Sequence, residues 1–238
     1  MNRQDTSVTL PWMGAGTEFL LRAVGALPDD ALADPSRLAG WTRAHVVGHL
    51  ARNADALTRL ATWARTGVET PMYGSREERA AEIEQSARAS ADVLRRELIE
   101  SAGTLDAALA ALDERTWQAP VRSAVGRPIP AAEIPWMRVR EVWLHAVDLD
   151  AGADVPDLPP DVVDTLLDDA SGTLSSKDGC PAALLVATDR DRSWSLGPDD
   201  DPVVVRGTAA DLLGWLIGRT GPERLTSPGT VPTPPVWL

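Results

Sequence analysis

The first 150 residues contain four long segments in which apolar residues recur at helical spacing, and this pattern constrains the fold more than any other feature. Helices are predicted over residues 7–27, 43–65, 76–112 and 131–150. Thr42 is placed to cap the second helix, and Gly67 follows its end. Four long helices joined by loops predict a helical bundle.

Some positions within this region should interrupt the helices. Pro11 removes a backbone donor inside the first helix, and Gly103 marks a break in the third. Residues 118–130 contain prolines and a glycine, so they are expected to form a loop. Ser75, with Glu78 three residues later, matches a capping box that starts the third helix.

The chain changes character after residues 155–160, which are rich in proline and predict a linker. Beyond it we expect a helix over residues 161–176, then short strands, and a last helix that Thr208 caps. The strands are predicted over residues 182–188, 193–196 and 202–206. The predicted fold class is mainly α with an α+β part: a four-helix bundle over residues 1–153 and a small α+β C-terminal domain over residues 154–238.

Composition argues against several classes of partner. The formal charge is −12 and the pI about 4.7, which disfavours binding to nucleic acid or to anionic membranes. No apolar run approaches the roughly 20 residues of a membrane span, and the N-terminus shows no secretion signal. The single cysteine, Cys180, cannot form an internal disulfide, as is usual in a reducing cytoplasm. We therefore expect a cytoplasmic protein. A monomer is also expected, although the sequence itself does not give the oligomeric state.

The three histidines of the chain lie in two of the predicted helices, and their positions point to a metal site. Glu141 and His145 are four residues apart, so they share one face of the fourth helix. With His49 of the second helix opposite them, the three side chains could hold a divalent metal with an open coordination position. One carboxylate and two imidazoles suit zinc, with iron(II) as the main rival.

The same helix also fits a plainer interpretation. Arg138, Glu141, His145 and Asp148 form one polar stripe, which can be a solvated face with an ion pair between Arg138 and Glu141. If the metal site exists, Asp148 is placed to orient the imidazole of His145. His45 lies further round its own helix, where we expect it to be exposed or to act behind the ligands. The spacing alone leaves both interpretations open.

Residues 40–51 and 138–149 together resemble the mycothiol-dependent maleylpyruvate isomerase family, which belongs to the DinB-like metal-binding four-helix bundles. The resemblance covers most of the chain, including the C-terminal domain with Arg219 after its last helix. It implies a substrate pocket at the metal, between the bundle and the C-terminal domain. It also implies a zinc ion held by three ligands, His49, Glu141 and His145.

The resemblance further implies a thiol cofactor, mycothiol, and two arginines that bind the substrate. Arg219 matches the arginine that the family uses at the end of its last helix, and Arg79 matches one early in the third helix. Arg219 is therefore expected to contact both the substrate and the cofactor. Each has a plainer interpretation: Arg219 as a cation at a helix end, and Arg79 as a surface residue paired with Glu82.

With the resemblance, these features imply a cis-trans isomerase that converts maleylpyruvate to fumarylpyruvate in gentisate-type aromatic degradation. A thiolate can add to the conjugated cis double bond, allow rotation and then leave, and coordination to zinc deprotonates a thiol. The arginines would bind a carboxylate and favour the enolate. Cys180 is no persuasive nucleophile. Two alternatives remain: a zinc-dependent mycothiol S-transferase acting on another electrophile, and a non-catalytic metal-binding module.

Overall fold

The computed structural model describes residues 3–198 and 201–237 of the chain. The chain divides into two compact units, one up to Ala153 and one from Asp154 onward. Within the described residues, no helix is both long and apolar enough to span a membrane. The predicted fold class, a helical bundle with a small α+β part, is confirmed.

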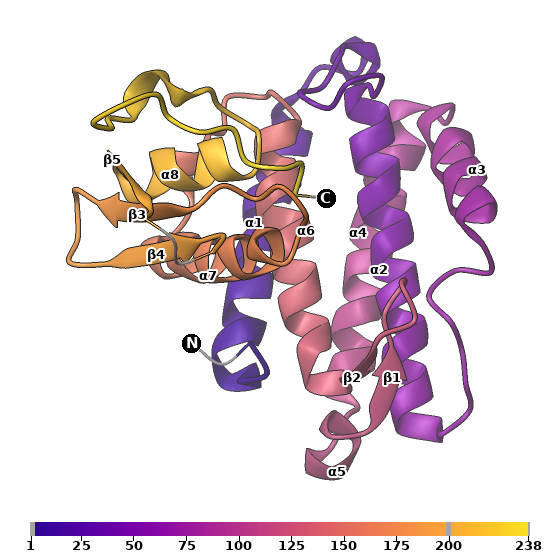
Figure 1. Ribbon diagram of the computed structural model, residues 1–238. Coiled ribbons are helices and arrows are strands. Elements are labelled where there is room, and N and C mark those ends of the chain that lie inside the picture. The colour runs from indigo at the N-terminus through magenta and orange to yellow at the C-terminus, as the bar shows by residue number, and fades with distance from the viewer. Residues whose placement is uncertain (1–2, 199–200, 238) are drawn as a thin grey trace. The chain divides into compact units, whose positions relative to one another are not determined.

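Four long helices form the bundle of the first unit (Figure 1): α1 (Thr6–Ala26), α2 (Arg43–Thr66), α4 (Ala91–Ala110) and α6 (Ile134–Asp148). Helix α2 packs against both α4 and α6, while α1 packs against α6. A shorter helix, α3 (Arg76–Ala87), lies along α2. Leucines such as Leu50, Leu57 and Leu94 fill the core, and burial of each contributes about 1.5–3 kcal/mol. This packing holds α2 and α6 side by side.

Helix α2 begins and ends where its sequence directs. Thr42 Oγ1 accepts a hydrogen bond from the His45 backbone N–H, and the Thr42 N–H donates to His45 Nδ1 at 3.2 Å. These two bonds form a capping box that starts the helix. At the other end Gly67 has a φ of 73°, a left-handed conformation that glycine adopts without a Cβ penalty. The prediction for this helix is confirmed.

Some local predictions for the first unit are wrong. Helix α1 continues through Pro11, because this residue is exposed and the single backbone acceptor that it leaves without a donor can be hydrated. The third predicted helix is divided at residues 88–90 and not at Gly103, which lies inside α4. Ser90 has an extended backbone with a ψ of 157°, so the chain leaves the helical path there.

Residues 118–130 contain a hairpin where the sequence predicted a loop. Strand β1 (Pro120–Arg122) pairs antiparallel with β2 (Pro128–Pro130). Val121 and Ile129 are opposite each other and buried, so apolar contact stabilises the short pair despite its prolines. The other short elements of this unit are η1 (Asp30–Ala33), α5 (Glu114–Trp117) and η2 (Ala131–Glu133).

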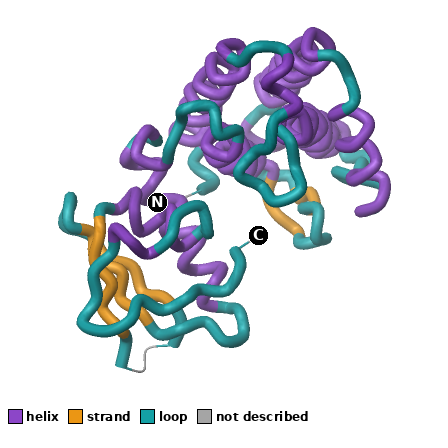
Figure 2. Tube along the Cα trace, turned by 90° about the horizontal axis from the view of Figure 1, so that it is seen from above, coloured by secondary structure: helices purple, strands orange, loops and turns teal. Residues whose placement is uncertain are grey.

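The second unit is a small sheet with two helices packed against it (Figure 2). Its elements are η3 (Val155–Asp157), α7 (Pro160–Ser175), β3 (Ala183–Ala187), β4 (Ser193–Leu196), β5 (Val203–Gly207), α8 (Ala209–Leu216) and η4 (Pro222–Arg224). The strand order is β4-β3-β5, with β3 antiparallel to β4 and parallel to β5. The predicted helices and strands of this region are confirmed. Val155, expected in a linker, is instead buried in a short turn that packs against α8.

Candidate metal centre

Three side chains from α2 and α6 converge inside the first unit. His49 Nε2 lies 2.8 Å from Glu141 Oε2, and His145 Nε2 lies 3.2 Å from the same oxygen. One ligand atom from each residue falls within 4.8 Å of the others, which makes this a group that could hold a metal ion. The two imidazole rings are nearly perpendicular, with their centroids 4.8 Å apart. The structure therefore brings the predicted ligands together, while their role as ligands stays a prediction.

Local sequence and helix packing both position the cluster. Glu141 and His145 share a face because four residues separate them on α6. Arg138, one turn before Glu141, donates from Nη1 to the Leu50 carbonyl at 2.8 Å and to Asn53 Oδ1 at 2.9 Å. These bonds tie α6 to α2 directly after His49 and within the following turn. Arg138 is only 1 % exposed, so the interpretation of this stripe as a solvated face is wrong.

Asp148 supports one of the imidazoles. Its Oδ2 lies 2.9 Å from His145 Nδ1, and its side chain is completely buried. A carboxylate at this distance accepts the Nδ1 proton and leaves Nε2, the atom that faces Glu141, as the ligand nitrogen. The role predicted for Asp148 fits this contact.

The cluster shifts the pKa of each member. Burial lowers the pKa of His49 below its ordinary value, against the opposing effect of Glu141. Burial alone would raise the pKa of Glu141, but hydrogen bonds with both histidines hold it well below its usual range. Burial opposes the charged form of His145, but Asp148 and Glu141 raise its pKa to about 9. At neutral pH, Glu141 and His49 are therefore already in the protonation states that bind metals, whereas His145 must release a proton.

Arg79 from α3 reaches the same cluster. Its Nη2 lies 3.2 Å from His49 Nδ1, and its guanidinium lies 5.5 Å from the centre of the Tyr73 ring. The predicted alternative, a surface ion pair with Glu82, is absent among the described residues. Arg219 belongs to the second unit, where it follows α8 and donates from Nη1 to the Ile217 carbonyl at 2.9 Å. The roles of both arginines stay predictions.

Family models match the chain over nearly its whole length. The model described as the mycothiol maleylpyruvate isomerase N-terminal domain matches residues 13–150. The chain belongs to the mycothiol maleylpyruvate isomerase family. The model of the C-terminal domain of that family matches residues 157–235. The resemblance found in the sequence is thereby confirmed.

Solved structures agree with this family assignment. A crystal structure of the mycothiol-dependent maleylpyruvate isomerase is 36 % identical in sequence, with a TM-score of 0.92, and the match covers 100 % of this chain and 98 % of that one. A histidine-to-alanine mutant of that isomerase matches with the same identity and coverage and a TM-score of 0.91. A comparison with curated proteins found no match.

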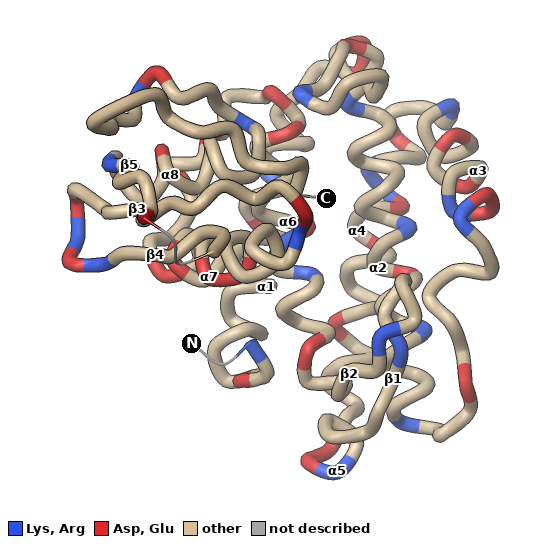
Figure 3. The backbone as a smooth tube through the Cα atoms, viewed as in Figure 1, with Lys and Arg blue, Asp and Glu red and all other residues tan. Residues whose placement is uncertain are grey.

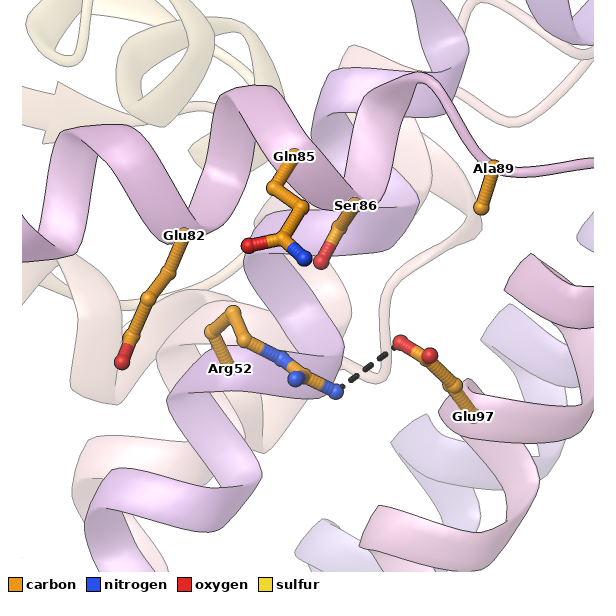
Figure 4. Close-up of a pocket in the computed structure, with 6 residues that line it drawn as sticks. All are labelled: Arg52, Glu82, Gln85, Ser86, Ala89 and Glu97. Atoms are coloured by element: carbon orange, nitrogen blue, oxygen red, sulfur yellow. Dashed lines mark hydrogen bonds and ion pairs between the residues drawn. The ribbon is translucent and has the colours of Figure 1, made fainter.

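Within this family member, a separate surface cavity of about 310 Å³ lies between α2, α3 and α4 (Figure 4). The residues that line it are Arg52, Glu82, Gln85, Ser86, Ala89 and Glu97. Arg52 is already paired with Glu97 at 3.0 Å and with Asp55 at 3.3 Å. Because its cation is neutralised and it contains none of the three converging side chains, this cavity is distinct from the candidate metal centre.

Sequence reasoning missed two features around the centre. Tyr73, the only tyrosine of the chain, stacks on Arg79, and its position six residues before Arg79 was the one available signal. Trp41 lies edge-on to His49, with ring centroids 5.6 Å apart.

His45, expected to be exposed or behind the ligands, is partly buried and caps α2, with Nε2 3.3 Å from Glu84. His45 therefore helps to start the helix that carries His49.

Proposed function

We propose that this chain is a zinc- and mycothiol-dependent maleylpyruvate isomerase, which converts maleylpyruvate to fumarylpyruvate. The observation that carries the proposal is the convergence of His49, Glu141 and His145 in a chain whose two parts both match the isomerase family. The main prediction from the sequence is thus retained.

The residues present fit a zinc ion. Two imidazole nitrogens and one carboxylate oxygen, each able to serve as one ligand, meet within 4.8 Å. Three protein ligands of these types are usual in catalytic zinc sites, where the fourth position stays open. Bound there, zinc would lower the pKa of a thiol and so supply a thiolate at neutral pH. Asp148 would hold the His145 imidazole in the orientation that the site needs.

The substrate is a dianion, and the chain supplies cations for it. Arg79 is partly buried beside His49 and has no carboxylate within ion-pair distance among the described residues. Its guanidinium can bind a substrate carboxylate and favour negative charge that develops on the conjugated system during thiol addition. Arg219, in the second unit, is proposed as the other arginine that binds the substrate and the thiol.

The experiment follows maleylpyruvate by ultraviolet absorbance with zinc-loaded protein, in the presence and absence of mycothiol. Rapid conversion to the trans isomer only with the thiol is expected. Absence of turnover by folded, zinc-replete protein would contradict the isomerase. In that case, stable thiol conjugates formed from a panel of electrophiles would instead identify an S-transferase.

The chain is further proposed to act as a monomer in the cytoplasm. A net charge of −12 favours mutual repulsion between copies, and a single cysteine suits a reducing compartment. Light scattering coupled to size-exclusion chromatography tests the first point, with a mass near the 25.4 kDa of one chain as the expected result.

A further inference from the structure

The region beside the metal centre contains an arginine and a tyrosine hydroxyl that have no acidic partner among the described residues. Arg79 forms no ion pair with any described carboxylate, and the Tyr73 hydroxyl donates to no described acceptor. The chain has 35 acidic and 23 basic residues, and both kinds are spread over the first unit (Figure 3). In so acidic a protein, an arginine without an acidic partner next to a candidate metal centre points to an anion from outside.

Two further arginines near Tyr73 and Arg79 also lack an ion-pair or hydrogen-bond partner, within the described ranges, for part of their guanidinium group. Arg59 donates from Nη1 to the Met72 carbonyl at 2.7 Å, which fixes the residue next to Tyr73, and it has no described carboxylate partner. Arg138 is buried, and its Nη2 has no hydrogen-bond partner in the described part of the chain. A buried guanidinium with an unpartnered amino group costs free energy unless another group accepts its hydrogen bonds.

The charges of Arg79, Arg59 and Glu141 affect the pKa of the Tyr73 phenol. Burial raises the pKa of its phenol, and although Arg79 and Arg59 oppose this effect, the pKa stays above the ordinary value of 10.0. The negative charge of Glu141 adds to the rise. The geometric link from Tyr73 to the metal centre runs through Arg79, which contacts both the Tyr73 ring and His49. At neutral pH the hydroxyl is therefore protonated and can donate a hydrogen bond.

The local structure holds Tyr73 and Arg79 together. Ser75 caps α3 by accepting a hydrogen bond from the Glu78 N–H at 3.0 Å, so the chain turns between Tyr73 and the first turn of the helix. Arg79, in that first turn, then reaches back over the Tyr73 ring at 5.5 Å. The pair presents a planar cation and a hydroxyl donor from the same short segment, an arrangement suited to a carboxylate.

We infer that Tyr73 is a further catalytic residue, whose hydroxyl donates a hydrogen bond to the substrate carboxylate that Arg79 pairs with beside the metal centre. The identity of that substrate rests on the proposed function, whereas the binding of a small dianion at this position does not. Tyr73 thereby selects for a doubly charged substrate, because one carboxylate can be held here while the rest of the molecule lies at the metal centre.

Two substitutions distinguish the contribution of the Tyr73 hydroxyl to anion binding from that of its ring. Tyr73→Phe removes the donor and keeps the stacking on Arg79, while Tyr73→Leu removes both. The probe is maleate, a cis dianion, titrated by calorimetry into protein with and without zinc. Circular dichroism and zinc content check that each variant is folded. Tyr73→Phe is expected to weaken maleate binding by about tenfold or more, the usual cost of losing a hydrogen bond to a charged group.

A second readout uses the fact that the chain has a single tyrosine. Protein labelled with ¹³C at the tyrosine ring carbon that bears the hydroxyl gives one signal, which maleate should shift in the wild type. Two results would overturn the inference: a wild type that does not bind maleate, or a Tyr73→Phe variant that binds it as well as the wild type. If Tyr73→Leu alone weakens binding, the ring merely supports Arg79.

The outcomes for Tyr73 and for the proposed function are distinguishable. A wild type that binds maleate through Tyr73 but does not isomerise maleylpyruvate contradicts the isomerase and leaves the anion site standing. If the isomerase is active, Tyr73→Phe should raise the KM for maleylpyruvate by about tenfold, in line with its effect on maleate.

Discussion

His145 donates its Nδ1 proton to Asp148 across 2.9 Å, and the accepting carboxylate is completely buried. A buried carboxylate in this position holds the ring in one orientation and one tautomer, with Nε2 directed at Glu141. The three converging side chains are thus supported from behind by a residue that would touch no metal itself.

This support predicts the effect of Asp148→Asn. The substitution preserves size but weakens acceptance of the Nδ1 proton, so zinc affinity should fall by about 10–100-fold. Competition with a fluorescent chelator measures the affinity. Asp150→Asn is the matched control, since Asp150 pairs with Arg37 and should leave zinc affinity unchanged. Equal affinities of the Asp148 variant and the wild type would show that this contact does not support a metal ligand.

The two histidines of α2 should respond differently to substitution. His49→Ala removes a proposed ligand and should sharply lower the zinc content of the purified protein. His45→Ala removes a cap contact and the contact with Glu84 but no proposed ligand, so it should retain zinc and lose about 0.5–2 kcal/mol of stability. Elemental analysis and urea denaturation measure the two quantities. A His49→Ala protein with a full complement of zinc would show that the ligand assignment is wrong.

The metal-free protein should lose stability as the pH rises above neutrality. The folded pKa of His145 is about 9, against 6.5 for the ordinary histidine, so its stabilisation is complete below pH 6.5 and disappears as the pH rises through about 9. The difference corresponds to at most about 3 kcal/mol. Urea denaturation at a series of pH values measures this loss, and Asp148→Asn should reduce it. A flat profile between those two pH values would contradict the assigned contacts of His145.

Glu141 should make the stability of the metal-free protein depend on pH in the acidic range. Its folded pKa lies well below the ordinary value of 4.5, so its stabilisation is present above that value and is lost as the pH falls further. The metal-free protein should therefore unfold in acid more readily than a zinc-loaded sample at moderately acidic pH. Glu141→Gln should flatten the acid limb of the stability profile, and an unchanged acid limb would argue against the pairing with both histidines.

Arg138 should prove to be a positioning residue. Arg138→Met leaves Asn53 Oδ1 without its donor, and a buried acceptor without a partner costs about 1–3 kcal/mol. The Leu50 carbonyl loses the same donor but keeps its hydrogen bond within α2. Zinc affinity should fall in parallel, because α2 and α6 lose the bonds that hold the ligands in register. The double variant Arg138→Met/Asn53→Leu should recover part of the stability but not the zinc affinity. Recovery of both would mean that Arg138 contributes packing alone.

Part of this structure follows from short-range patterns in the sequence. The boundaries of α2 are set by Thr42 and Gly67, and the shared face of Glu141 and His145 follows from helical spacing. The predictions at Pro11 and Gly103 failed for a common reason: local propensity differences of about 1–3 kcal/mol per residue are overridden when neighbouring turns of a helix are packed. Here the bundle kept both helices continuous.

By itself the sequence determined which residue types stand at which turns of which helices, and so which side chains share a face. Only the tertiary structure decided that Arg138 and Asp148 are buried, that Arg79 approaches His49, and that Tyr73 stacks on Arg79. These contacts join α2, α3, α6 and the segment before α3, which are far apart in sequence. Helical periodicity describes one element at a time, whereas the distance between side chains of two elements depends on how the packed core fixes their register.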